Sequence, residues 1–176
     1  MTISDPLLPY VPRLVVDWLA EEPQARHRSW DATAVFADIS GFTALTEALA
    51  RRGRVGAEVM GDTLNLVFGE LLTAAYGHGA GLLKWGGDAV LLLFDGPDHV
   101  SRAAAACLEM QQAIRTAGVV RTGSGSRDRV RLRMSIGLHA GEFDFLLVGR
   151  RFRDLVVTGR SEEHTSELQS PMYLVC

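Results

Sequence analysis

Residues 82–94 (LLKWGGDAVLLLF) contain two apolar runs separated by a short turn with two glycines. Apolar runs of this length predict buried strands, and glycines between them allow the tight turn of a β-hairpin. We therefore expect strands at 82–84 and 89–94, joined by Trp85, Gly86, Gly87 and Asp88. A hairpin in the middle of the chain favours an antiparallel sheet.

The rest of the chain alternates between strand and helix patterns. Strands are expected at four further places: 32–39, 130–139, 142–148 and 154–158. Helices are expected at an entry segment, 13–22, and then at 42–49, 55–76 and 99–117. This order predicts the α+β class, with helices packed on an antiparallel-rich sheet.

Composition excludes several classes of protein. With 176 residues, of which 47% are hydrophobic and 22% charged, the chain is sized for one soluble domain. The longest apolar runs are too short to span a membrane, and the first residues lack the pattern of a secretory signal. A net charge of −3 without a basic stripe argues against nucleic acid as a partner. Two cysteines form neither a disulfide framework nor a metal motif, so we expect a cytoplasmic protein.

Residues 161–176 (SEEHTSELQSPMYLVC) differ from everything before them. They hold three acidic residues and no Arg or Lys, whereas residues 1–160 hold 18 of each charge. The stretch RSEEHTSELQS also matches a reading-frame translation of a widely used short-read sequencing adapter. We therefore expect a non-native tail at 161–176, with native sequence ending near Gly159 and no function for His164 or Cys176.

Two aspartates stand where strands are expected to end. Asp38 closes the strand at 32–39 and is followed by Ser40, Gly41 and a helix, while Asp88 lies at the tip of the hairpin. Carboxylates at strand ends beside a helix N-terminus suit Mg²⁺ and phosphate together. On spacing alone, the alternative that Asp38 caps the helix and Asp88 is an ordinary turn residue is equally good.

Lys84 is the only lysine among 18 basic residues, and the other 17 are arginine. A compact ammonium can reach a single acceptor in a narrow pocket, where the guanidinium fork of an arginine does not fit. Without other information, a single lysine is more often a surface residue than a functional one.

Three blocks in this order resemble the class III adenylate/guanylate cyclase catalytic domain: VFADISGFTALTE (35–47), LLKWGGDAVLLLF (82–94) and RMSIGLHAGE (133–142). The resemblance covers about 32–159 and implies a ferredoxin-like cyclase fold, incomplete at the C-terminus. It divides the chain into a lead-in at 1–31, a partial catalytic domain at 32–160 and the tail at 161–176. The segments 7–22 and 82–99 are most similar to large actinobacterial proteins, in which such domains precede an ATPase and regulatory region.

The resemblance also implies roles for single residues. Asp38 and Asp88 match the aspartates that bind two Mg²⁺ or Mn²⁺ ions, and Ile39 matches the residue whose backbone carbonyl contacts metal. Lys84 matches the lysine that adenylate cyclases place against the adenine ring. The loop that cradles the triphosphate is matched by Ser40, Gly41, Phe42 and Thr43. We expect Asp38 and Asp88 on adjacent strand ends, with carboxylates close enough to share a two-metal site.

The implied activity is that of a phosphorus–oxygen lyase of intracellular signal transduction, which forms cyclic AMP and pyrophosphate from ATP, with GTP as the alternative substrate. A homodimer is expected, because the site of this family lies between two catalytic domains. The expected partners include no nucleic acid, and the chain contains no expected membrane segment.

The chain departs from the family pattern at several positions. The transition-state Asn and Arg lie beyond Gly159 in the family and have no counterpart here. Val156 replaces a polar purine-selecting residue, and Ser135 stands where many members have an Arg. We therefore expect the chain as written to be inactive. The alternative function is a degenerate cyclase-homology domain that binds nucleotide or dimerises and regulates an attached ATPase.

Overall fold

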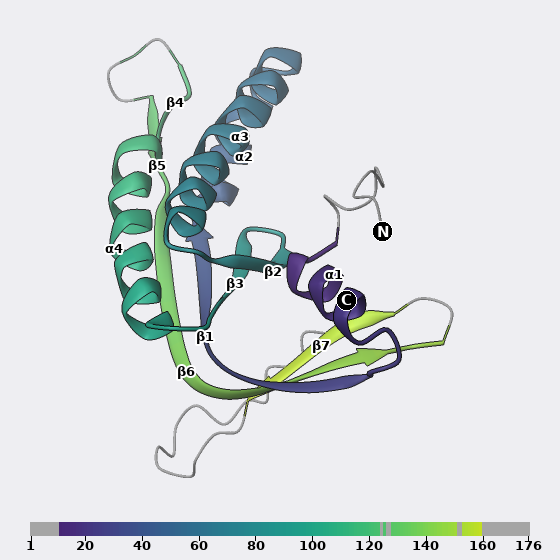
Figure 1. Cartoon of the computed structure of the whole chain (residues 1–176). Helices are drawn as coiled ribbons and strands as arrows, with labels where there is room; N and C mark the ends of the chain where they lie inside the picture. Colours follow the sequence, from purple (N-terminus) through teal and green to yellow (C-terminus); the bar gives the residue numbers. More distant parts are fainter. Residues whose placement is uncertain (1–10, 124, 126–127, 151–152, 160–176) are drawn as a thin grey trace, which may run out of the picture.

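The computed structural model describes residues 11–123, 125, 128–150 and 153–159 (Figure 1). The tail, with His164 and Cys176, therefore lies outside the described residues. The elements follow one another as α1 (Arg13–Glu21), β1 (His27–Ser40), α2 (Phe42–Ala50), α3 (Arg54–Gly77), β2 (Gly81–Gly86), β3 (Ala89–Asp95), α4 (His99–Ala117), β4 (Val119–Arg121), β5 (Arg129–Arg131), β6 (Arg133–Val148) and β7 (Asp154–Gly159).

Five strands form one antiparallel sheet in the order β2-β3-β1-β6-β7, and β4 pairs with β5 in a separate two-stranded sheet. β1 pairs with β6 along its whole length, from His27 opposite Leu146 to Ser40 opposite Arg133. Figure 1 shows this long pair bending strongly, so that β7 lies beneath α1. The sheet is therefore curled, and the expected α+β class with an antiparallel-rich sheet is confirmed.

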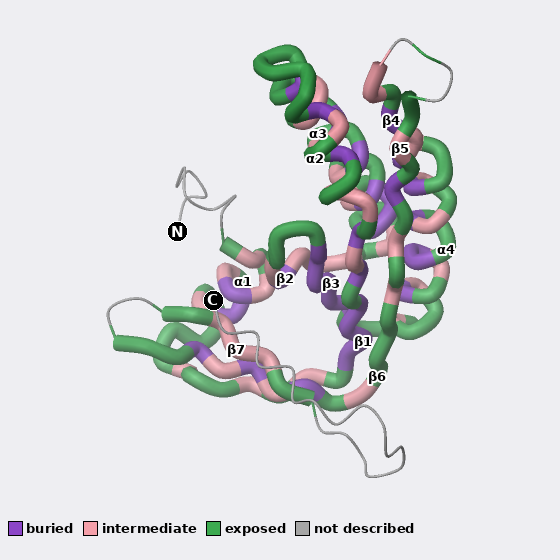
Figure 2. Tube along the Cα trace, turned by 180° about the vertical axis from the view of Figure 1, so that it is seen from behind, coloured by how far each residue is buried: buried purple, intermediate pink, exposed green. Residues whose placement is uncertain are grey.

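One face of the sheet packs against α2, α3 and α4. Side chains alternate between the two faces of a strand, and Val35, Ala37 and Ile39 of β1 all point into this layer with no exposed surface. Val90 and Leu92 of β3 join them. Figure 2 shows the buried residues concentrated along β1, β3 and the inner sides of the helices.

The opposite face holds a second, smaller core under α1. Trp18 of α1 is 1% exposed and meets Trp30 of β1 edge to face, with ring centroids 5.9 Å apart. Leu91 of β3 and Phe145 of β6 complete this cluster from the two sides of the curl. The entry helix is therefore packed on the sheet, on the face opposite the other helices.

The expected hairpin is confirmed, since β2 pairs with β3. Two expected boundaries are wrong. β1 begins at His27 and not at residue 32, because His27 and its neighbours pair with the far half of β6. The strands expected at 130–139 and 142–148 are split elsewhere: β5 ends at Arg131, and β6 runs from Arg133 through the expected break, because Gly141 pairs with Ala32.

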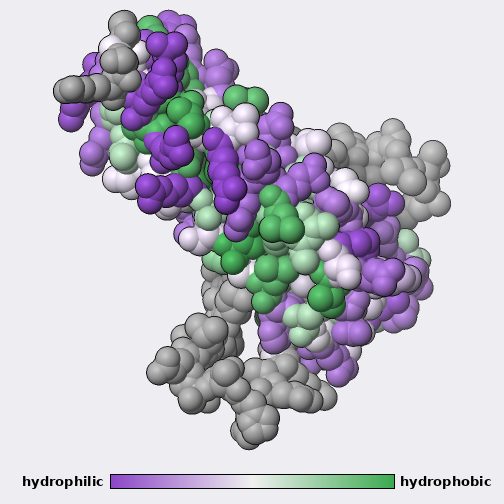
Figure 3. Space-filling model, turned by 90° about the vertical axis from the view of Figure 1, so that its left-hand side faces the viewer, coloured by the Kyte–Doolittle hydropathy of each residue, from purple (hydrophilic) through white to green (hydrophobic). Residues whose placement is uncertain are grey.

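The surface is mixed. On the side that carries α4 in Figure 1, Figure 3 shows a hydrophobic patch in the middle of a mostly hydrophilic face. Apolar side chains are exposed on both α4 and β6, among them Val100, Leu108 and Leu138. Among the described residues, no helix is long and apolar enough to cross a membrane.

Candidate active site

Asp38 lies two residues before the end of β1, on the face of the sheet away from α2, α3 and α4. Its neighbours Ala37 and Ile39 are fully buried in the helix-covered core, so the alternation of the strand turns Asp38 to the other side. Its side chain is half-buried. A carboxylate in this position is fixed by a rigid strand and still reachable from solvent.

Asp88 lies beside it, at the tip of the β2–β3 hairpin. Gly87 adopts a φ of +72°, which allows the chain to turn and deliver Asp88 to the start of β3. Asp38 is the register partner of Ala89, and the amide of Ile39 donates a hydrogen bond of 3.0 Å to the carbonyl oxygen of Asp88. The expectation that the two aspartates lie on adjacent strand ends is therefore confirmed.

The two carboxylates fit a hard divalent cation. The hydrogen bonds and ion pairs of the described residues leave both side chains unpaired. In the same part of the chain, no group of three or more His, Cys, Asp and Glu residues forms a closed metal cage. Two aspartates and a backbone carbonyl would leave most of the coordination sphere to water and phosphate, which is the arrangement Mg²⁺ favours.

The loop after Asp38 leads directly into α2. Gly41 has a φ of +103° and sits against the end of β5, where a Cβ atom would lie 3.1 Å from the carbonyl oxygen of Arg131 and 3.3 Å from the side chain of Leu132, the residue between β5 and β6. The amides of Phe42 and Thr43 begin the helix, where no preceding turn supplies their carbonyl partners. The sequence therefore places free amide donors beside the two aspartates, at the positive end of a helix.

Lys84 lies on β2 opposite Leu91, on the same face as Asp38. It is half-buried and lines a small cavity of about 20 Å³ with Leu155 and Val157 of β7. The curl of the sheet brings these opposite edge strands together. Val156 is the register partner of Leu146 and lies on the other face of β7, so it does not line this cavity.

Trp85, next to Lys84, anchors the hairpin to the helices. Its ring meets Phe68 of α3 edge to face with centroids 4.7 Å apart, and Phe68 stacks on Phe42 of α2 at 6.1 Å. This row of aromatic rings ties the hairpin that carries Asp88 to the start of α2. These contacts make Trp85 an anchor of the hairpin on the helices.

Sequence reasoning missed one residue at this end of the sheet. Arg133, the first residue of β6, lies directly opposite Ser40 and is exposed. Ser135 lies opposite Asp38 in the same register. The register between β1 and β6 is a long-range property, so no local signal in the sequence pairs Arg133 with Ser40.

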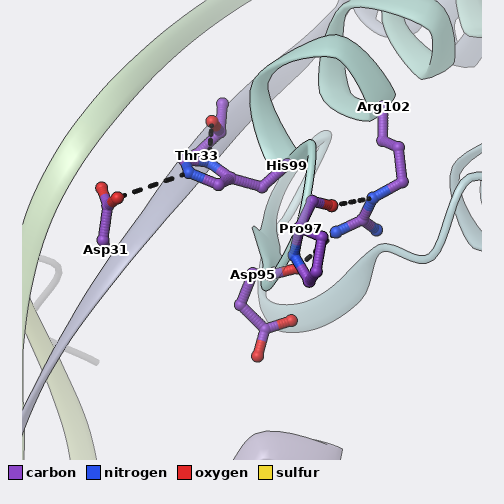
Figure 4. A network of polar contacts seen from close by, with 6 residues as sticks. All are labelled: Asp31, Thr33, Asp95, Pro97, His99 and Arg102. Carbon is purple, nitrogen blue, oxygen red and sulfur yellow. Dashed lines mark hydrogen bonds and ion pairs between the residues drawn. The ribbon is translucent and has the colours of Figure 1, made fainter.

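A second polar network lies at the start of α4 (Figure 4). The ring of His99 hydrogen-bonds Thr33 Oγ1 at 2.8 Å and lies 3.7 Å from the carboxylate of Asp31. The order Asp, His, Thr resembles a nucleophilic triad, but Thr33 is only 1% exposed and cannot meet a substrate. The network instead fixes the beginning of α4 to β1.

Comparison with known proteins assigns most of the chain to one family. The family model described as the adenylate and guanylate cyclase catalytic domain matches residues 25–172. Adenylate cyclase type 10 of Oryctolagus cuniculus is 28% identical over 149 residues, which are 82% of this chain and 9% of that protein. Its counterpart in Rattus norvegicus is 34% identical over 89 residues, or 48% of this chain and 5% of that protein. The chain thus spans less than a tenth of the length of these relatives.

Solved structures agree with the fold. The guanylyl cyclase Cya2 superimposes with a TM-score of 0.58 at 28% identity, over 77% of this chain and 66% of that chain. The guanylate cyclase domain of RhGC from Catenaria anguillulae, solved in complex with GTP, gives 0.56 at 25% identity, over 75% and 68%. A bacterial light-regulated adenylyl cyclase gives 0.67 at 19% identity, over 87% and 44%, and this likeness concerns the fold alone.

Proposed function

The chain belongs to the adenylate and guanylate cyclase catalytic domain family, and we propose that its site takes ATP and forms cyclic AMP and pyrophosphate with two Mg²⁺ or Mn²⁺ ions. The observation that carries this proposal is the pairing of Asp38 with Asp88 through the hydrogen bond of Ile39. It brings two unpaired carboxylates to one end of the sheet, beside the free amides of α2.

In this reaction the 3′-hydroxyl oxygen of the ribose bonds to the α-phosphorus, the bond to the β-phosphate oxygen breaks, and the hydroxyl proton is released. The bound ions supply positive charge that stabilises the α-phosphate and lowers the pKa of the hydroxyl. Asp38, Asp88 and the Ile39 carbonyl hold the ions. The loop of Ser40, Gly41, Phe42 and Thr43 orients the triphosphate through its amides, so the protein acts by positioning and electrostatics.

We propose that Lys84 binds the adenine ring of the nucleotide. Its ammonium can donate a hydrogen bond to an acceptor on adenine. GTP is the alternative substrate, and the complex of the similar Catenaria anguillulae domain with GTP supports a purine nucleoside triphosphate in either case. We propose that two copies form a homodimer in the cytoplasm.

We propose that the chain as written has no cyclase activity. No Asn follows Gly159 in the sequence, and 161–176 is proposed to be the non-native tail, so the transition-state donors of the family are absent. Loss of one such donor typically costs about 10²–10³ in rate. Binding of metal and nucleotide depends on residues before Gly159 and is expected to remain.

A second candidate function is a regulatory module that binds nucleotide without turnover. Two observations favour it: Ser135 is the neutral residue opposite Asp38, and the cavity beside Lys84 is otherwise lined by apolar side chains. A module that binds nucleotide differs from the cyclase only in turnover, whereas a module that only dimerises and regulates an attached ATPase needs no nucleotide.

Incubation of the purified chain with ATP and Mn²⁺, followed by quantification of cyclic AMP, tests whether the chain as written turns over the nucleotide. We expect no product above that of an Asp38→Ala control. Product that Asp38→Ala abolishes would show that the missing donors are dispensable and that the chain as written is an active cyclase. The native sequence beyond Gly159 decides the parent's role: an Asn and an Arg in the first helix there support turnover, and apolar residues support the regulatory module.

A further inference from the structure

A groove lies between α1 and β2, away from the pair of aspartates. It has a volume of about 1180 Å³, and its walls come from α1, from β2 and from the loop that follows α3. Leu14 of α1 and Leu82 of β2 are two of the apolar side chains that line it. Figures 1 and 2 both show α1 beside the β2–β3 hairpin. A hollow of this size is as large as the pockets that hold whole ligands.

β2 is an edge strand of the sheet. Among the described residues it pairs with β3 alone, so its outer edge presents backbone amides and carbonyls without strand partners. Proteins cover or blunt such edges, because an open edge invites pairing with another chain. Residues 81–85 of β2 all line the groove. An occupant of the groove would therefore cover β2 along most of its length.

One side chain of the groove wall is a buried donor that lacks an acceptor. Trp18 lines the groove and is 1% exposed, yet its indole N–H has no hydrogen-bond partner among the described residues. A buried tryptophan usually finds a partner for this group, and leaving it unpaired costs about 1–3 kcal/mol. A backbone carbonyl oxygen of an occupant is the kind of acceptor that this donor lacks.

Charged side chains of the groove neutralise one another in pairs. Arg13 Nε lies 3.5 Å from a carboxylate oxygen of Asp17, and Arg28 donates a hydrogen bond of 2.9 Å to Glu21. All four of these residues line the groove. The walls beside α1 therefore suit an uncharged, apolar occupant better than an ionic one.

The chain itself contains a segment of this character. Residues 1–10 lie outside the described residues, and they lead into Val11 and Pro12, which line the groove. The second half of this segment reads PLLPY (6–10) and carries no charge. Its two prolines restrict the unbound segment, so binding costs less conformational entropy. Five extended residues span about 16 Å, which is most of the length of a six-residue strand such as β2.

We propose that residues 6–10 fill the groove between α1 and β2 and lie along the free edge of β2. Leu7 and Leu8 supply the apolar side chains, and a carbonyl oxygen of the segment accepts the hydrogen bond of the Trp18 indole. The segment thereby acts as an intramolecular strap on the strand that carries Lys84. This inference does not depend on a bound nucleotide. A second copy of the chain is the alternative occupant.

Hydrogen exchange of backbone amides, followed by mass spectrometry on the full 176-residue chain, tests this placement. The variant Leu7→Asp with Leu8→Asp puts two charges on the apolar part of the segment. The matched control, Thr2→Asp with Ser4→Asp, adds the same charge outside residues 6–10. A milder variant is Leu7→Ala with Leu8→Ala. Exchange is compared between peptides that cover β2 and peptides that cover α4, which does not line the groove.

We expect the Leu7→Asp, Leu8→Asp variant to exchange the amides of β2 at least about tenfold faster than the unmodified chain, and the control pair less than about twofold faster. The cause is the loss of the cover over the strand edge, so α4 should exchange as before. The alanine pair should fall between the two. Exchange of β2 in the unmodified chain should not depend on the protein concentration.

Other outcomes would overturn the proposal. Unchanged exchange of β2 in both leucine variants would show that residues 6–10 do not cover it. Equal acceleration in the control pair, or in α4, would show a general effect of charge or stability. Protection of β2 that falls when the unmodified chain is diluted would assign the groove to a second copy. If the aspartate pair fails to fold, the alanine pair decides by the same criteria.

Discussion

The amide of Ile39 donates a hydrogen bond of 3.0 Å to the carbonyl oxygen of Asp88. This bond joins the end of β1 to the tip of the β2–β3 hairpin, one residue beyond the pair formed by Asp38 and Ala89. It fixes the backbone of both aspartates in one ladder. The backbones of the two aspartates are therefore held side by side at one end of the sheet.

The turn after Asp38 depends on glycine, and its replacement should destabilise the fold. Gly41→Ala puts a Cβ into a left-handed conformation and 3.1 Å from the carbonyl oxygen of Arg131. We expect a loss of about 1–3 kcal/mol in the free energy of unfolding, measured by urea denaturation.

Gly61→Ala is the matched control, because Gly61 lies inside α3 with no atom within 4 Å of an added Cβ. It should raise the free energy of unfolding by about 0.5–1 kcal/mol, since alanine favours the helix. Equal effects of the two substitutions would contradict the strained turn.

The base of the β2–β3 hairpin is held by one arginine. Arg102 of α4 donates hydrogen bonds to the carbonyl oxygens of Asp95, Pro97 at 3.1 Å and His78 at 3.0 Å, and Figure 4 shows two of these contacts. Arg102→Ala leaves these acceptors without their charged donor, so we expect a loss of about 1.5–3 kcal/mol in unfolding free energy. Arg121→Ala, at an exposed position of β4, should change it by less than about 0.5 kcal/mol. A loss no larger than in Arg121→Ala would show that solvent replaces Arg102.

Cys107 should be an unreactive thiol. It is buried in α4, and this burial raises the pKa of the thiol, so the thiolate fraction at a given pH is lower than for a free cysteine. In a Cys176→Ser background, we expect Ellman's reagent to react at pH 8 only as fast as the protein opens, with full reaction in urea. The raised pKa also makes the folded state lose stability as the pH rises above the ordinary thiol value. Rapid modification of the native protein would contradict this burial.

The sequence predicts where the strands of the site lie better than it predicts how these strands pair with one another. The hairpin and Asp38 at a strand end follow from local patterns, because apolar runs and glycines are read within a few residues. The length of β1 does not, because His27 is held in the strand by pairing with Leu146, far along the chain. For the same reason, the sequence does not predict that Arg133 lies opposite Ser40.

The curl of the sheet has a similar origin. Leu155 and Val157 line the same small cavity as Lys84, because β1 and β6 bend together and bring the two edge strands nearer to each other. Sequence comparison with the family draws attention to Val156, while the register places that residue on the other face. A one-residue difference along a strand reverses the face on which a side chain lies, so the face of Val156 is set by its pairing with Leu146.

The central claim is that Asp38 and Asp88 together hold the metal ions that the nucleotide requires. Its most direct test is the Mn²⁺-dependent binding of a non-cyclisable ATP analogue, the α,β-methylene triphosphate, to Asp38→Asn, Asp88→Asn and the control Asp62→Asn, an exposed acid of α3. We expect each of the first two substitutions to remove the dependence on Mn²⁺ and to weaken binding at least about tenfold, with Asp62→Asn unchanged. Full Mn²⁺-dependent binding in both Asp38→Asn and Asp88→Asn would contradict the claim.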